Sequence, residues 1–160
     1  MEKRYKLLIQ QLNSILDGET DTIANLSNVS ALLFHGLDNI NWAGFYFKKN
    51  DELILGPFQG KVACMHIQLD RGVCGKAATT KEIQCVPNVH EFEGHIACDS
   101  ASNSEIVVPI VIDREVFGVL DIDSFEFNNF NETDVYYLGE LVDNLIKHIY
   151  TRNNHDLKIL

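Results

Sequence analysis

The chain has 160 residues, 46% of them hydrophobic, and a formal net charge of −10 from 13 basic and 23 acidic side chains. This length predicts one domain, and the apolar content is enough for a core that needs no disulfides. The acidic balance argues against nucleic acid and anionic lipid as partners, because both require clustered Lys and Arg. No apolar run reaches the roughly 18–20 residues of a membrane span, and residues 1–16 do not resemble a signal peptide. The four cysteines are therefore expected to be reduced thiols in the cytoplasm.

Two amphipathic helices are predicted at the start of the chain. Apolar residues recur at helical spacing over residues 2–16 and again over about 20–37. The turn between the two segments supplies an N-cap for the second helix. Gly36 is expected to form the C-terminal cap of that helix.

Short strands are predicted through the middle of the chain, at residues 41–49, 52–58, 61–69 and 82–86. Residues 72–80 are rich in small side chains and bounded by glycine, which indicates a short helix or a close backbone turn. Residues 87–104 form a long polar segment. A loop of that length in a compact domain is typically functional.

A β-hairpin over residues 105–124, turning at Asp113 and Arg114, is predicted next. Asn131 then caps a last helix with apolar residues at helical spacing. Helices at both ends of a run of strands indicate an α+β fold. We expect a central antiparallel β-sheet with the N- and C-terminal helices packed on one face.

The strongest functional signal is the run GHIACDSASNSE at residues 94–105. It places Cys98 after two histidines, His90 and His95, and before Glu105. A thiol that neighbouring groups can convert to a thiolate is a candidate nucleophile. Together with further cysteines upstream and carboxylates downstream, this run predicts redox chemistry on a small molecule.

Asp121 and Asp123 lie two residues apart on a predicted strand, so their side chains share one face of the sheet. Leu120 and Ile122 would then face the other side. With Glu105, the two aspartates make three carboxylates. Like charges held close together raise a pKa, so one of the three is expected to stay protonated near neutral pH while another is ionised.

Other interpretations of these residues stay open. A zinc site would draw on cysteines and histidines, but none of them has C-x-x-C or H-x-x-x-H spacing. A Cys–His hydrolase, with His90 or His95 as the base, would leave two cysteines unexplained. The cysteines and aromatic residues could also be ordinary core residues. The possible zinc ligands are Cys64, His66, Cys74, His90, His95 and Cys98.

Four segments of the chain resemble a GAF domain, and more closely the free methionine-(R)-sulfoxide reductases. They are NWAGFYF at 41–47, GPFQGKVAC at 56–64, RGVCG at 71–75, and GHIACDSASNSEIVVPI joined to GVLDIDS at 94–124. The resemblance implies a single GAF domain over residues 1–160, with the family-specific motifs at 41–124. It also leads us to expect a homodimer.

The resemblance implies an enzyme that reduces free L-methionine (R)-S-oxide to L-methionine. A cysteine nucleophile would form a sulfenic acid and then an intramolecular disulfide. Thioredoxin, or dithiothreitol in vitro, would reduce that disulfide, and no bound cofactor or metal is expected. The alternative is a non-catalytic GAF sensor of a small ligand or a redox signal.

The resemblance also implies a role for each cysteine. Cys98 matches the nucleophile, Cys64 is favoured as the resolving cysteine, and Cys74 is a second recycling or alternative resolving cysteine. Cys85 lies outside the shared pattern and is expected to be a buried structural thiol.

The resemblance also matches Glu105, Asp121 and Asp123 to the carboxylates of the substrate pocket. Our own expectation for their roles is that Asp123 and Glu105 polarise or protonate the sulfoxide oxygen while Asp121 helps to hold the ammonium group. Trp42 and Tyr46, four residues apart on one strand face, would contact the methyl-thioether end. The backbone of Ile96, Ala97 and Cys98 would bind an anionic group, the substrate carboxylate.

Overall fold

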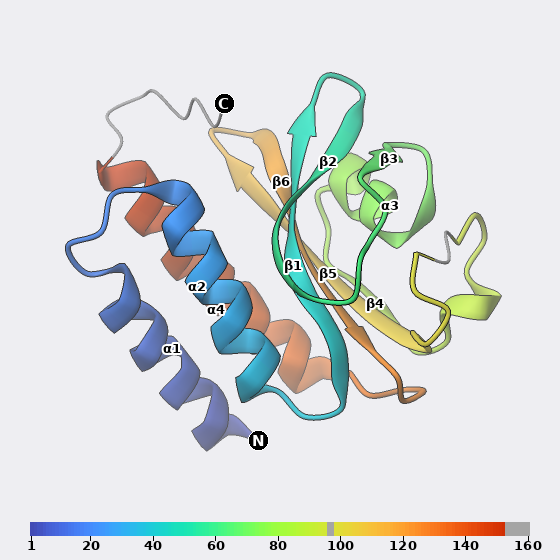
Figure 1. Cartoon of the computed structure of the whole chain (residues 1–160), viewed down its shortest axis with the longest axis horizontal. Helices are drawn as coiled ribbons and strands as arrows, with labels where there is room; N and C mark the ends of the chain where they lie inside the picture. Colours follow the sequence, from blue (N-terminus) through green and yellow to red (C-terminus); the bar gives the residue numbers. More distant parts are fainter. Residues whose placement is uncertain (96–97, 153–160) are drawn as a thin grey trace.

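The computed structural model of the chain describes residues 1–95 and 98–152. A six-stranded antiparallel sheet in the order β3-β2-β1-β6-β5-β4 lies at its centre. Helices α2 and α4 pack on one face of this sheet, α1 packs against these two helices, and α3 lies against the other face (Figure 1). The predicted α+β class, with terminal helices packed on one face of an antiparallel sheet, is confirmed.

The elements follow the predicted order. The longest helix is α4, and no helix in the described part of the chain is long and apolar enough to cross a membrane. The helices are α1 (Glu2–Leu16), α2 (Thr22–Gly36), α3 (Gly72–Thr80) and α4 (Glu132–Arg152), with a short 3₁₀ turn η1 (Val89–Glu91). The strands are β1 (Ile40–Lys49), β2 (Glu52–Gly60), β3 (His66–Gln68), β4 (Gln84–Val86), β5 (Ser104–Ile112) and β6 (Glu115–Ser124).

The main hydrophobic core lies between the sheet and helices α1, α2 and α4. Helical spacing brings the apolar side chains of each helix to one side, as the sequence predicts. Alternation along the central strands sends every second side chain into the same layer. Completely buried members include Leu12, Leu33, Phe45, Leu120, Ile122 and Leu145.

The opposite face of the sheet carries a second, smaller hydrophobic cluster, against which α3 packs. Here Trp42 and Tyr46 of β1 meet Val107 of β5 and the small side chains of α3. Because successive strand residues point to opposite faces, the aspartate between Leu120 and Ile122 belongs to this face. The polar segment between β4 and β5 lies on the same side as α3 (Figure 1).

Gly36 does not form a left-handed cap, so that expectation is wrong. It is the last residue of α2, and the N–H of Leu37 closes the helix by bonding Leu33 O at 3.0 Å. The glycine is needed for packing instead: a Cβ there would lie 2.4 Å from Leu8 Cδ2 of α1. Glycine is needed at this position because α1 and α2 approach each other closely. Such an approach depends on both helices and does not follow from the sequence of either one.

The predicted strand over residues 61–69 is shorter than expected. Only His66–Gln68 pairs with β2, and residues 61–65 run without regular secondary structure. The predicted hairpin turn is confirmed, with Asp113 and Arg114 at φ 50° and 69°. Two consecutive residues with positive φ match the right-handed twist of the flanking strands.

Candidate active site

A pocket opens on the α3 face of the sheet and gathers His95 and the seven predicted catalytic and substrate-binding residues listed below. Strands β1, β5 and β6 form its floor, while α3 and the turn after residue 97 supply its walls. Ile96 and Ala97, the predicted anion-binding backbone, lie outside the described residues. The predicted residues that line the pocket are Trp42, Tyr46, Cys74, Cys98, Glu105, Asp121 and Asp123.

Three carboxylates meet because two strands pair in register. Glu105 on β5 is directly opposite Asp123 on β6, and Asp121 is two residues further along β6 on the same face. Glu105 and Asp121 are each only 7% exposed. Among the described residues, no Lys or Arg forms an ion pair with any of the three. An acidic cluster of this kind must be partly protonated or bind a cation.

Burial raises the pKa of all three carboxyl groups, and the charges of neighbouring carboxylates raise the pKa of Glu105 and Asp123 further. Burial raises the pKa of Glu105 well above its usual value, and the neighbouring Asp121 and Asp123 raise it further. Burial also raises the pKa of Asp123 well above its ordinary range. The pKa of Asp121 rises only to about 6, because hydrogen bonds from Glu105 and Cys74 favour its ionised form. The raised pKa values favour the protonated forms of Glu105 and Asp123, whereas Asp121, with a pKa of about 6, is the most readily ionised of the three.

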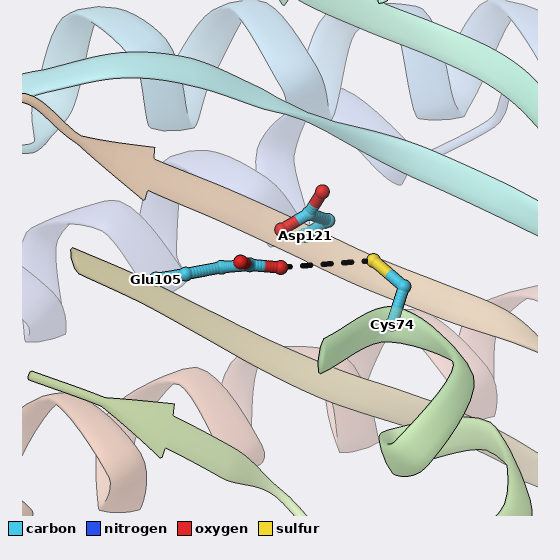
Figure 2. A group of neighbouring side chains, drawn as sticks. All are labelled: Cys74, Glu105 and Asp121. Carbon is cyan, nitrogen blue, oxygen red and sulfur yellow. Dashed lines mark hydrogen bonds between the residues drawn. The ribbon is translucent and has the colours of Figure 1, made fainter. Parts of the chain in front are cut away.

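Cys74 projects from α3 toward these acids (Figure 2). Its Sγ lies 3.9 Å from Glu105 Oε1, and the side chain is 4% exposed. Burial, and then the charges of Asp121 and Glu105, raise the pKa of this thiol well above its usual value. It is therefore held as a neutral thiol, which is a poor nucleophile. The recycling role that the resemblance implies for Cys74 stays a prediction.

Cys98 is joined to Cys64 by a disulfide, with 5.4 Å between the two Cα atoms. This is the pair that the resemblance favours, although their roles in a reaction stay predictions. Cys64 belongs to the irregular segment 61–65, whose backbone is held by the Tyr46 hydroxyl, which donates to Cys64 O at 2.9 Å. The buried aromatic layer and the disulfide are thus in direct contact.

The Trp42 ring lies between two other aromatic rings. Its centroid is 5.8 Å from that of Tyr46 and 5.2 Å from that of Phe58. In residues 1–95 and 98–152, Trp42 Nε1 and Asp121 Oδ1 are buried and have no hydrogen-bond partner. Buried polar atoms normally have partners, so this donor and this acceptor are available to a ligand. The sequence predicts Trp42 only as an apolar contact.

The two histidines of the hydrolase alternative lie side by side, with ring centroids 6.2 Å apart, but only His95 lines the pocket. His95 lines the pocket, and burial and the nearby His90 lower its pKa, which keeps the ring neutral at pH 7. His90 is exposed and makes a 2.8 Å hydrogen bond to Asn103. His66 pairs with Glu52 on the outer strands, outside the pocket lining.

The six possible zinc ligands do not gather at one place in the described residues. The ligand atoms of a different set, Cys74, Glu105 and Asp121, lie within 4.8 Å of one another. Sequence spacing could not reveal this set, because its members come from α3, β5 and β6. Their raised pKa values mean that protons compete with any metal for these atoms.

Further pocket residues were not predicted. Arg71, Asp99 and Ser102 also line the pocket. They lie within the RGVCG and GHIACDSAS runs, but spacing alone does not tell which polar residues of a loop face inward. Cys85 is half-buried on β4 and packs against the main core, away from the pocket, so the fully buried thiol expected there is only partly right.

Known proteins resemble the chain over most of its length. A family model described as GAF domain matches residues 24–145. The free methionine-R-sulfoxide reductase of Escherichia coli (strain K12) is 50% identical over 147 residues, which are 92% of this chain and 89% of that protein.

Two solved structures show the same likeness in three dimensions. The reduced form of fRMsr of Staphylococcus aureus has 50% identity and a TM-score of 0.88, covering 91% of this chain and 94% of that one. The free methionine-R-sulfoxide reductase of Neisseria meningitidis in complex with its substrate has 43% identity and a TM-score of 0.89, covering 92% and 89%.

Proposed function

Because the chain belongs to the GAF-domain family and, within it, to the free methionine-R-sulfoxide reductases, we propose that it reduces free L-methionine (R)-S-oxide to L-methionine. One observation carries the proposal: a disulfide between Cys64 and Cys98 adjoins a pocket of buried, partly protonated carboxylates. The pairing of a reactive sulfur with nearby acids is what sulfoxide reduction requires.

The Cys98 thiolate attacks the sulfoxide sulfur while the pocket acids protonate the departing oxygen. The hydroxyl then passes from the substrate sulfur to Cys98 Sγ as the sulfur–sulfur bond formed in the attack breaks, so that methionine leaves and Cys98 holds a sulfenic acid. The Cys64 thiol then attacks Cys98 Sγ, which forms the disulfide and releases water. The disulfide of the structure supports this assignment, since it corresponds to the oxidised enzyme after one turnover.

The carboxylates divide between two tasks. Glu105 and Asp123, whose pKa values are raised most, hold the protons that the sulfoxide oxygen needs. Asp121 is ionised near pH 7, and its unpartnered Oδ1 accepts the substrate ammonium. Trp42 and Tyr46 contact the methyl end of the substrate, and the backbone of residues 96–98 binds its carboxylate.

An external dithiol completes the cycle by reducing the Cys64–Cys98 disulfide through thiol–disulfide exchange. Thioredoxin in the cytoplasm, or dithiothreitol in vitro, fills this role. Cys74 serves as a second recycling cysteine only if the surrounding acids release it, because its buried thiol is held neutral.

The test uses reduced protein freed of dithiothreitol and mixed with each epimer of methionine sulfoxide. We expect about one methionine per chain from the R epimer, none from the S epimer, and continuous turnover once thioredoxin or dithiothreitol is added. Cys98→Ser should release none. Cys64→Ser should release one methionine and leave a sulfenic acid that a 1,3-diketone reagent traps.

Cys85→Ser is the matched control, because this cysteine is free and lies outside the pocket. It should turn over like the wild type. Tight binding of methionine sulfoxide without methionine release would instead favour the GAF sensor. Single turnover by Cys74→Ser, together with continuous turnover by Cys64→Ser, would exchange the two resolving roles.

A further inference from the structure

Asn41 ties the first long strand of the sheet to the turn beside the pocket. The register of β1 against β6 shifts between Ile40 and Trp42, so Asn41 has no residue opposite it on β6. A bulge of this kind redirects a side chain. The Asn41 amide donates one hydrogen bond to Asp99 Oδ2, at 3.1 Å, and one to Ser102 Oγ, at 3.0 Å.

The turn that follows Cys98 is closed by hydrogen bonds to Asp99. Its Oδ1 accepts from the Ala101 N–H at 2.9 Å, and its backbone oxygen accepts from the Ser102 N–H at 3.2 Å. The second carboxylate oxygen of Asp99 is the one that Asn41 binds. Asn41 therefore links the closed turn to the sheet immediately after the reactive cysteine.

Ser102 extends the network into the pocket. Ser102 is buried and lines the pocket together with Asp123, and its hydroxyl is the neighbour that lowers the pKa of Asp123 and so favours the ionised form of that carboxyl. A hydroxyl has one proton. Because the Asn41 amide approaches Ser102 Oγ as a donor, that proton is left to point at Asp123. The bond lowers the pKa of Asp123 and opposes burial and the charges of Asp121 and Asp99, which raise it.

We propose that Asn41 is a positioning residue of this site: through Ser102 it orients a hydroxyl on Asp123, and through Asp99 it holds the turn that carries Cys98. Asn41 does not itself line the pocket, so it acts on the reaction through these two neighbours. The kinetic consequence rests on the proposed function, whereas the effect on Asp123 does not.

Loss of the Ser102 donor should raise the pKa of Asp123 further, because the remaining neighbours do not stabilise its charge. Asp121, on the same strand, and Asp99 repel it. The other titratable groups that line the pocket are Glu105 on β5, Tyr46 on β1, Cys74 on α3, Arg71 at the N-terminus of α3, and His95.

The experiment compares Asn41→Ala, Ser102→Ala and the double variant. It measures kcat/KM for methionine-(R)-sulfoxide against pH and the titration of the Asp123 carboxyl by carbon-13 NMR. Each single variant should lose about 10-fold in kcat/KM, the scale for one hydrogen bond to a charged group. Each should also move the Asp123 titration to higher pH. If Asn41 acts through Ser102, the double variant moves it no further than Ser102→Ala.

Asn144→Ala is the matched control. Its amide donates to Glu140 O on α4, remote from the pocket, and its loss should leave both readouts at wild-type values. If Asn41→Ala fails to fold, Asn41→Ser replaces it. The shorter serine hydroxyl cannot reach both partners, so we expect the same displacement of the Asp123 titration to higher pH.

An unmoved Asp123 titration in Asn41→Ala, or additive displacements in the double variant, would overturn the proposal and leave Asn41 a purely structural residue. If the wild-type protein releases no methionine, the proposed function fails. The NMR titration still decides the role of Asn41 in that case, so the two failures are distinguishable.

Discussion

The two faces of the sheet use neighbouring residues of the same strand for opposite purposes. On the face covered by α1, α2 and α4, Leu120 and Ile122 are completely buried among apolar side chains. On the α3 face, Asp121 is buried beside Glu105, without a Lys or Arg ion pair in the described part of the chain. Apolar burial stabilises the fold by about 25 cal/mol per Å², whereas burial of unpaired charge opposes folding. One face therefore stabilises the protein, and the other holds the groups to which we assign the proposed reaction.

Leu120→Ala should cause the largest loss of stability. The leucine is completely buried in the main core, and its truncation leaves a cavity, which costs about 2–5 kcal/mol. Urea unfolding measures this loss, and the folded fraction should keep its activity. Ile122→Val, on the same face, should cost only about 0.5–1.5 kcal/mol. A loss below about 1 kcal/mol for Leu120→Ala would mean that the core adjusts around the cavity.

Asp121→Asn should have the opposite profile. Loss of the carboxylate that we assign to the substrate ammonium should lower kcat/KM about 10- to 100-fold, the scale for a hydrogen bond between charged groups. The free energy of unfolding should not fall, because a buried, unpaired charge is removed. Steady-state kinetics and urea unfolding on one preparation test both points. Asp143→Asn, exposed on α4, is the control. Lower stability with unchanged kcat/KM would contradict the division of the two faces.

The free energy of unfolding should also depend on pH. Asp121 has a pKa of 3.8 as its ordinary value and about 6 in the folded protein. Between these values the folded protein binds more protons than the unfolded chain, so the free energy of unfolding falls as pH rises. The contribution is complete below pH 3.8 and is lost as pH rises through about 6.

Urea unfolding at intervals from pH 4 to 7 measures this slope in the wild type and in Asp121→Asn. Both proteins should carry the Cys64–Cys98 disulfide, so that only the titrating group differs. The wild type should lose stability more steeply than the variant. Parallel slopes would show that Asp121 titrates alike in the folded and unfolded states.

Local patterns predicted most of the fold because they act over a few residues. Helical periodicity located the terminal helices, and alternation along β6 placed Asp121 and Asp123 on one face. The failures concern long-range contacts. Gly36 is required because Leu8 approaches it closely. The strand predicted at residues 61–69 is shortened to β3 because only three of those residues pair with β2.

The sequence by itself determined the fold class, the reactive segment and the carboxylates, because residue type and spacing carry that information. Tertiary structure alone decided how these groups meet. It joined Cys98 to Cys64, held Cys74 among acids as a neutral thiol, and turned Asn41 toward the turn after Cys98 through a bulge. These outcomes depend on burial and on distances between separate elements, which no spacing along the chain specifies.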